Sequence, residues 1–390
     1  MIPKHRFVVA ILTLVMLVGG ACGPSGPTTI RIVANLPMGF SFGKESENGL
    51  RLAFSQAGYK VGRYPIELVL NSSSPEGRAE ISPELVISAA QAAVADPQVV
   101  AFIGSATSAE AKMTIPITNR GGVAHLSVSA TWPGLTKAGF APGEPGVYYP
   151  TGKRNFFRIM PADDIQGVVG AKWAAQQEYK IVYVINDDDP YSEGLSRIFA
   201  ANAPDNGLAV VGRELLTPEG IEGLVTRIVT SKADLVYYPL SVDNSTLGYA
   251  FLLALRTQLP QIAIMGGDGL VSAPLPADPT RLEGISATQS PDAQQLDTAD
   301  SFSAAYIAAY GEPPSPIALL SYESGGVLLA ALRKVALPTR EGVLTALQNL
   351  DDYDGAFGRW RFDRNGDTTV KTLSVWQLRN GRWQFVQILR

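Results

Sequence analysis

Hydrophobic residues along the chain form short, nearly continuous strings that alternate with longer amphipathic stretches. Strings of Val, Ile and Leu with few polar positions are typical of strands that are covered on both faces. We therefore predict eight such strands. They lie at residues 30–36, 66–71, 99–105, 123–129, 180–187, 208–215, 234–241 and 261–269.

The amphipathic stretches between these strings have helical spacing. They lie at residues 45–57, 83–95, 165–178, 192–203 and 246–256. Strands that alternate with helices in this way predict an α/β fold with parallel sheets and right-handed crossovers. Beyond residue 301 the pattern contains more helix, and the chain ends in strands.

The N-terminal residues carry the pattern of an export signal. A basic start precedes an apolar run at residues 7–18, which suits a signal peptide better than a membrane-spanning helix because it is short. Small residues then lead to the only cysteine, Cys22. We predict a signal peptide at 1–21 and a flexible tether at 22–27.

The position of Cys22 directly after the apolar run resembles the bacterial lipobox, in which the cysteine is lipidated and becomes the new N-terminus. Gly19 departs from that pattern, which has a branched apolar residue at this position. The alternative is an ordinary signal peptide that leaves Cys22 as a spare thiol.

Composition narrows the possible functions. The 390 residues include 36 acidic and 32 basic side chains, with a formal net charge of −4. Mild acidity without a basic cluster argues against nucleic acid as a partner. A single cysteine excludes an internal disulfide and a thiol-based metal site. The length favours two lobes over one domain.

The loops that follow the predicted strands are the places to look for a ligand, because open parallel sheets bind ligands beyond the carboxyl ends of their strands. These loops are rich in Gly, Ser and Thr and contain two turns with aspartate. They read GFSFG, GSATS, SVSAT, NDDDPYSEG, PLSVDN and GGDGL.

Two of these loops have the chemistry that a free amino acid requires. Ser108 lies where a helix begins, and the N–H groups of a helix start suit a carboxylate, although plain capping explains a serine there equally. Asp268 lies between glycines, where it is either a partner for an ammonium group or part of an ordinary Asp-Gly turn.

Taken in order, these segments resemble the extracytoplasmic solute-binding proteins of branched-chain amino acid ABC transporters. The resemblance covers nearly all of the chain after the predicted signal. The segments that carry it are VVAFIGSATSAEAKMTIPITNRGGVAHLSVSATWPGLT, KIVYVINDDDPYSEGLSRIF, IMGGDGL and the FD-x-x-GD pattern within GRWRFDRNGD.

The resemblance implies a type I periplasmic binding protein fold, in which two Rossmann-like α/β lobes with parallel-core sheets are joined by a three-segment hinge. It places lobe one at 28–155 and 273–352, and lobe two at 156–272 and 353–390. It implies no enzymatic activity, no cofactor and no metal.

The implied function is to bind a neutral aliphatic (branched-chain) amino acid between the lobes and to deliver it to an ABC transporter permease. We expect a monomer that is anchored at the outer face of the membrane through Cys22.

The resemblance also assigns the ligand-binding residues. They are Phe42, Ser108, Ser129, Ala130, Thr131, Tyr191, Ser241 and Asp268. Phe42 is expected to cover the ligand side chain, and Asp268 to hold the ammonium group. Two positions depart from the family pattern, since Val128 replaces a proline and Ser241 stands where relatives often have a tyrosine.

Several alternatives remain open. Relatives also bind amides, urea or aromatic acids. A ligand-sensing module is a second alternative. The third is a serine hydrolase, because GFSFG matches the G-x-S-x-G pattern with Ser41 as nucleophile. His125 is the only histidine that follows the signal, and it lies in a predicted strand without an acidic partner nearby, so we expect it to be structural.

Overall fold

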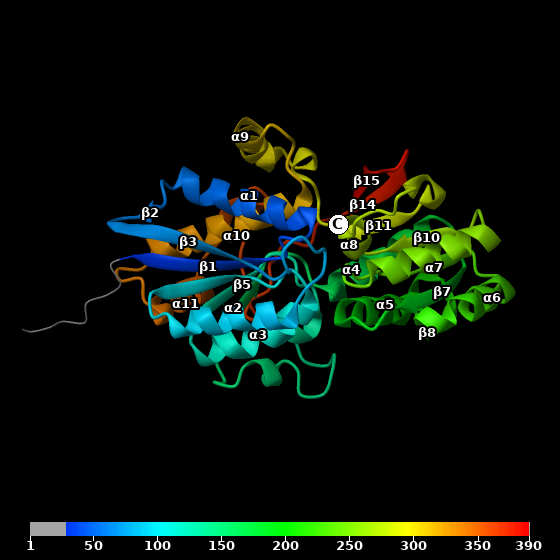
Figure 1. The fold of residues 1–390 in the computed structure, drawn as a ribbon, viewed down its shortest axis with the longest axis horizontal. Helices are drawn as coiled ribbons and strands as arrows, with labels where there is room; N and C mark the ends of the chain where they lie inside the picture. The colour runs from blue at the N-terminus through cyan, green and yellow to red at the C-terminus, as the bar shows by residue number, and fades with distance from the viewer. Residues whose placement is uncertain (1–28, 390) are drawn as a thin grey trace, which may run out of the picture.

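The computed structural model describes residues 29–389, which form two α/β lobes side by side (Figure 1). Each lobe contains its own mostly parallel sheet, with helices on both faces. Each of the eight predicted strands corresponds to a strand of the structure. Cys22, the predicted signal peptide and the predicted tether lie outside the described residues.

The first lobe contains a six-stranded sheet in the order β2-β3-β1-β4-β5-β6. Only the β2–β3 pair is antiparallel. The strands are β1 (Ile30–Leu36), β2 (Lys60–Val61), β3 (Tyr64–Ser72), β4 (Val99–Gly104), β5 (Ala124–Ser127) and β6 (Phe156–Arg158).

The second lobe contains a seven-stranded sheet in the order β15-β14-β11-β10-β9-β7-β8, in which the last two strands of the chain add an antiparallel edge to a parallel core. The strands are β7 (Ile181–Asn186), β8 (Ala209–Leu215), β9 (Leu235–Tyr237), β10 (Ala263–Gly266), β11 (Ser286–Gln289), β14 (Leu373–Arg379) and β15 (Arg382–Leu389).

Helices cover both sheets, because nearly continuous apolar strands must be buried on both faces. In the first lobe they are α1 (Ser41–Gln56), α2 (Pro83–Ala95), α3 (Ser108–Arg120), α9 (Asp300–Tyr310), α10 (Pro316–Arg333) and α11 (Arg340–Gln348). In the second lobe they are α4 (Asp163–Gln176), α5 (Pro190–Asn202), α6 (Ile221–Ser231), α7 (Ser245–Gln258) and α8 (Asp268–Ser272).

The chain crosses between the lobes three times, but sheet membership places these crossings later than the predicted lobe boundaries. β6 pairs with β5, so the first lobe extends to Arg158 rather than to residue 155. β11 pairs with β10 and β14, so the second lobe extends to Gln289 rather than to residue 272. The small hairpin of β12 (Tyr353–Gly355) and β13 (Gly358–Trp360) packs against α10 of the first lobe, where Trp360 donates to Glu323.

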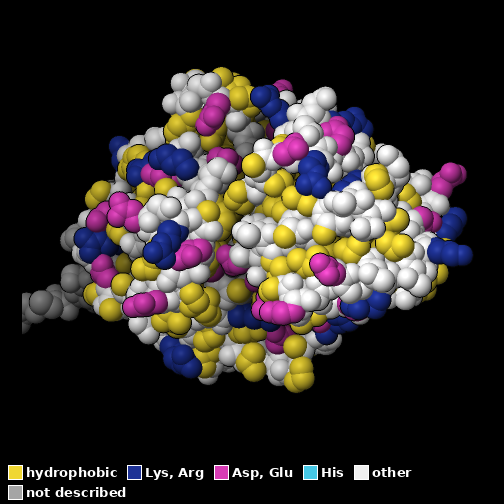
Figure 2. Space-filling view, turned by 45° about the vertical axis from the view of Figure 1, so that its right-hand side comes forward, with side chains coloured by type: hydrophobic (Ala, Val, Ile, Leu, Met, Phe, Trp, Pro, Cys, Tyr) yellow, Lys and Arg dark blue, Asp and Glu magenta, His cyan; other side chains and the backbone are white. Residues whose placement is uncertain are grey.

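The outer surface of residues 29–389 carries acidic and basic side chains interspersed on both lobes in the view of Figure 2. No helix in this part of the chain has the length and apolar content that crossing a bilayer requires.

Candidate functional site

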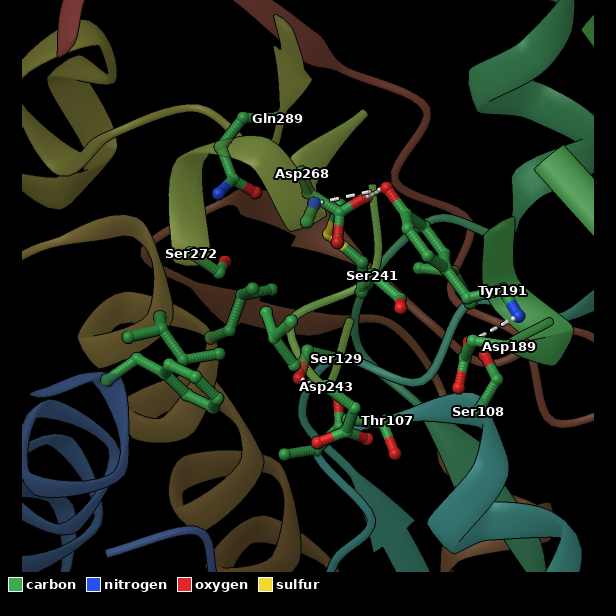
Figure 3. A pocket seen from close by; sticks show the side chains of 18 residues that line it. Thr107, Ser108, Ser129, Asp189, Tyr191, Ser241, Asp243, Asp268, Ser272 and Gln289 are labelled. Carbon is green, nitrogen blue, oxygen red and sulfur yellow. Dashed lines mark hydrogen bonds between the residues drawn. The ribbon is translucent and has the colours of Figure 1, made fainter. Parts of the chain in front are cut away.

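A pocket lies between the lobes, where loops and helix starts from both sheets converge (Figure 3). It forms at the carboxyl ends of the parallel strands, as expected for an open α/β sheet. Seven of the residues predicted from the sequence line it. They are Phe42, Ser108, Ser129, Thr131, Tyr191, Ser241 and Asp268.

The start of α3 forms one wall of the pocket. Thr107 rather than Ser108 caps this helix. The Thr107 hydroxyl accepts a hydrogen bond from the Glu110 N–H at 3.2 Å, and the Glu110 carboxylate accepts one from the Thr107 N–H at 2.9 Å. Ser108 is the first helical residue. The first N–H groups of a helix have no partners within it and carry positive dipole charge, so this wall is suited to an anion.

The segment 129–131 forms the adjoining wall and is fixed by hydrogen bonds. The Ser129 hydroxyl donates to the Ala106 carbonyl at 2.7 Å. Ala130 was predicted as a ligand residue but does not line the pocket, because its N–H donates to the Ser127 hydroxyl at 2.9 Å and its side chain is buried. Ser129 and Thr131, on either side of it, face the pocket instead.

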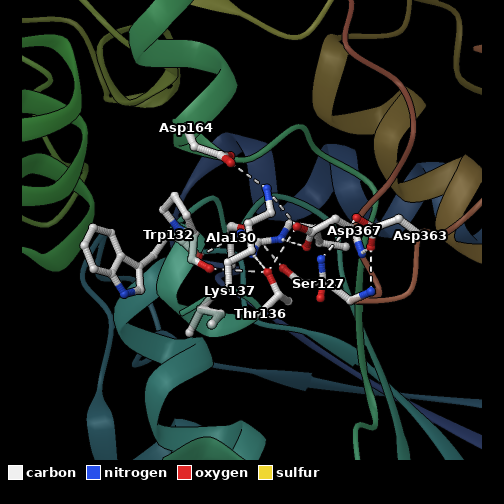
Figure 4. A network of polar contacts seen from close by, with 12 residues as sticks. Ser127, Ala130, Trp132, Thr136, Lys137, Asp164, Asp363 and Asp367 are labelled. Carbon is white, nitrogen blue, oxygen red and sulfur yellow. Dashed lines mark hydrogen bonds and ion pairs between the residues drawn. The ribbon is translucent and has the colours of Figure 1, made fainter. Parts of the chain in front are cut away.

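A buried ion-pair network supports this segment from behind (Figure 4). Arg158 is fully buried and donates to Asp367 at 2.7 Å and to the Trp132 carbonyl at 2.9 Å. Lys137 bonds Asp164 of the second lobe at 2.7 Å and pairs with Asp367 at 3.1 Å. The network therefore joins the pocket wall, the first crossing and the terminal segment.

Asp268 faces the pocket from the start of α8, directly after β10. Gln166 donates to its Oδ1 at 2.9 Å and the Tyr191 hydroxyl donates to the same atom at 3.1 Å. Both bonds fall on Oδ1, so Oδ2 is not engaged by either residue. Burial raises the pKa of Asp268, and the bonds from Gln166 and Tyr191 act in the opposite direction.

A second carboxylate, Asp163, lies behind this wall. It begins α4, it is fully buried, and neither of its side-chain oxygens has a hydrogen-bond partner among residues 29–389. Burial and then the neighbouring charge of Asp268 raise its pKa well above the ordinary value. The sequence reasoning missed both Asp163 and Gln166, which share the first turns of α4.

Asp189 ends the NDDD segment, which begins at the last residue of β7. Asp189 caps α5, accepting from the Tyr191 N–H at 2.8 Å, and it is only 8% exposed and lines the pocket. Burial, and to a lesser degree neighbouring acids, raise the pKa of Asp189 to about 7.

The opposite side of the pocket is apolar. Phe42 packs against Phe40 with ring centroids 5.1 Å apart, and Ile317 and Leu320 of α10 extend the surface. Lining residues that the sequence reasoning did not name as ligand contacts include Met160, Val242, Asp243, Ser272 and Gln289. Gln289 ends β11, a four-residue strand (SATQ) whose short, mixed composition gave no strand signal.

Ser241 lies at the pocket, whereas Ser41, the nucleophile of the hydrolase alternative, does not. Ser241 is buried at the pocket, and its hydroxyl has no partner among the described residues. Ser41, in contrast, is an exposed residue at the start of α1. His125 is fully buried in β5, where it bonds Ser105 and Thr118, and burial lowers its pKa to about 3. It cannot act as a base for Ser41.

Within residues 29–389 there is no cluster of His, Cys, Asp or Glu that could hold a metal ion.

Comparison with known proteins agrees with this architecture. The model of a family described as periplasmic binding protein matches residues 37–382. The Leu/Ile/Val-binding protein BraC3 of Rhizobium johnstonii is 28% identical, over 88% of this chain and 89% of that protein. A Leu/Ile/Val-binding protein homolog of Brucella melitensis is 24% identical, over 94% and 95%.

Two solved structures show the same fold. The leucine-binding protein LivK of Thermotoga maritima superposes with a TM-score of 0.78 at 23% identity, covering 93% of this chain and 99% of that one. A solute-binding protein of R. palustris in complex with benzoate superposes with a TM-score of 0.73 at 17% identity, covering 92% and 96%.

Proposed function

Because the chain belongs to the periplasmic binding protein family, whose members are non-enzymatic solute-binding proteins of ABC transporters, we propose that its solute is a neutral aliphatic α-amino acid of the branched-chain type. The solute lies in the pocket between the lobes. Its carboxylate, ammonium group and side chain each meet a different wall.

The carboxylate is held at the start of α3. Ser108 and the N–H groups of the first turn offer hydrogen bonds and the positive end of the helix dipole. Thr131 adds a donor from the adjoining segment. These groups attract a carboxylate without a basic side chain.

The ammonium group is held by Asp268 in this proposal, and the geometry of the Asp268 carboxylate is the observation that carries it. Gln166 and Tyr191 both bond Oδ1, which orients the carboxylate and leaves Oδ2 for the solute. A cation in a buried pocket needs an acidic partner, because its desolvation is otherwise costly.

The side chain of the solute lies against Phe42, Ile317 and Leu320. Burial of a methylene group against such a surface contributes about 0.8 kcal/mol. Extended aliphatic side chains should therefore bind more tightly than alanine.

Two alternative solute classes deserve comparison. An aromatic acid suits the apolar wall and is found in the R. palustris relative. However, an aromatic acid has no ammonium group and so provides no cationic partner for Asp268, which makes this class less favoured than an amino acid. A neutral amide or urea is favoured only by Ser241, whose hydroxyl has no partner among residues 29–389 and which, by the family resemblance, stands in place of a tyrosine.

We also propose that solute binding favours the closed arrangement of the lobes, because the solute contacts both. The closed monomer is then recognised by a membrane permease. Cys22 would provide a lipid anchor at the outer face of the membrane.

A thermal-shift screen tests the proposed solute class, since a ligand that binds only the folded state raises the melting temperature. The screen includes the free amino acids, benzoate, acetamide and urea. Leucine, isoleucine and valine should give the largest shifts. Tighter binding of glutamate, arginine, benzoate or an amide than of these three would contradict the proposal.

A further inference from the structure

A tryptophan from the first lobe packs into a gap on a helix of the second lobe, beside the pocket. Trp132 follows the 129–131 segment directly and is 2% exposed. Its ring lies against Gly194 of α5. A Cβ added to Gly194 would lie 2.1 Å from Cζ3 and 2.3 Å from Cε3 of the Trp132 ring, so only glycine permits this contact.

Side chains from both lobes hold the ring in this place. In the first lobe, Glu144 accepts from the indole N–H at 2.9 Å, and the ammonium nitrogen of Lys112 lies 4.9 Å from the ring centroid. In the second lobe, the guanidinium carbon of Arg197 lies 5.3 Å from the centroid. Arg197 also donates to the Phe140 carbonyl across the lobes at 2.7 Å. Both cations therefore lie within the distance at which they interact favourably with the face of the indole ring.

The backbone of Trp132 is tied to the pocket wall. Its N–H donates to the Ser108 hydroxyl at 3.1 Å, and its carbonyl accepts from Arg158 at 2.9 Å. In Figure 4 the ring of Trp132 points away from the network that includes Thr136, Lys137 and Asp367.

On the other side of the contact, Gly194 lies one turn after Tyr191, whose hydroxyl bonds Asp268. The contact thus joins the segment that follows Thr131 to the helix whose Tyr191 orients Asp268. Neither Trp132 nor Gly194 lines the pocket.

We propose that Trp132 and Gly194 are positioning residues that hold the two lobes closed around the solute and so set its affinity. This inference rests on the proposed function. The measured affinity of a protein that binds in one conformation is reduced by the fraction of molecules outside that conformation. A change that disfavours the Trp132–Gly194 contact should therefore weaken all solutes by the same factor, without changing their order.

The variant Gly194→Ala tests this directly. Alanine is a better helix former than glycine, so α5 itself is not weakened, while the new methyl group displaces the Trp132 ring. The matched control is Gly170→Ala in α4 of the same lobe, where an added Cβ lies 3.5 Å from Met265, an ordinary contact.

Calorimetry should show that Gly194→Ala weakens leucine, isoleucine and valine by a common factor of ten or more, and that Gly170→Ala stays within three-fold of wild type. Small-angle scattering of the same samples should show a larger radius of gyration for Gly194→Ala than for wild type and the control. Scattering is also measured without solute, so it tests the Trp132–Gly194 contact independently of binding. If no amino acid binds to wild type, the proposed function is refuted, but the scattering comparison still tests the contact. Equal affinities and equal radii for Gly194→Ala and wild type would overturn the inference.

Discussion

At the scale of single residues, the proposal that Asp268 holds the ammonium group predicts that loss of its charge weakens amino acid binding. Asp268→Asn keeps an oxygen that accepts from Gln166 and Tyr191 but removes the charge. Loss of one partner of a buried charged pair typically costs about 2–5 kcal/mol. Leucine affinity measured by calorimetry should fall about thirty-fold to several thousand-fold.

Asp351→Asn is the control for Asp268→Asn, because the Asp351 side chain is 91% exposed and lies outside the pocket. It should bind as wild type does. An Asp268→Asn affinity within about three-fold of wild type would mean that the ammonium group is held elsewhere or that the solute has none.

The raised pKa of Asp189 predicts how the free energy of unfolding depends on pH. Its folded-state pKa of about 7 lies above the ordinary value of 3.8, so the folded protein binds more protons than the unfolded chain between these values. Stability should therefore fall as pH rises from about 4 to 7, because the buried acid must ionise. Asp189→Asn removes this penalty and retains an oxygen that can cap α5.

Denaturation of the ligand-free proteins at pH 4.5 and pH 8 measures the contribution of Asp189. The free energy of unfolding of Asp189→Asn minus that of wild type should be larger at pH 8 than at pH 4.5, by about 1–3 kcal/mol. A difference between variant and wild type that does not change with pH would show that Asp189 is not the group responsible.

The strand ends indicated where a site should form, but the family resemblance, and not residue types alone, assigned Asp268 and Tyr191 to it. Burial could not be predicted from the sequence. Asp189 has the local sequence pattern of a solvent-exposed helix cap, and only its tertiary contacts bury it. Gln166 bonds Asp268, 102 residues further along the chain, and Asp163 senses the charge of the same residue, which no local pattern shows.

At the scale of elements, strands that lie within long apolar strings were predicted, and strands outside such strings were missed. β6 contains three residues and β11 four, and neither has an apolar string long enough to stand out. The lobe boundaries, which the family resemblance supplied, fall before each of these strands. The start of α1 was also predicted late, because the GFSFG segment reads as a turn although Ser41 is already helical.

The terminal segment is attached to β6 through Asp367, and this attachment should be important for stability. Asp367→Ala leaves the fully buried Arg158 without its acidic partner. Breaking such a pair from one side typically costs about 3–5 kcal/mol. Urea denaturation should show a loss of that size.

The control for this loss is an exposed ion pair. Lys334 and Asp351 lie 3.2 Å apart at the surface, and such pairs contribute about 1 kcal/mol or less. Asp351→Ala should therefore change stability little. Similar small losses for Asp367→Ala and Asp351→Ala would show that the buried network does not support the crossing segments.

At the scale of the whole molecule, the proposed lipid anchor determines where the protein works. Two acyl chains are needed for stable anchoring, and lipidation at Cys22 would supply them. In cells, wild type should fractionate with membranes, and Cys22→Ser should be released or remain unprocessed. If both proteins fractionate identically as soluble species, the protein is exported without an anchor.

The central claim for the whole molecule is that the closed pocket binds a zwitterion with an aliphatic side chain. Calorimetric titration with leucine and with 4-methylpentanoate tests it most directly, because the two solutes share the carboxylate and the side chain and differ only in the ammonium group. The account predicts that leucine binds at least about thirty-fold more tightly, since only leucine provides a partner for Asp268. Equal affinities for the two solutes, or tighter binding of 4-methylpentanoate, would contradict it.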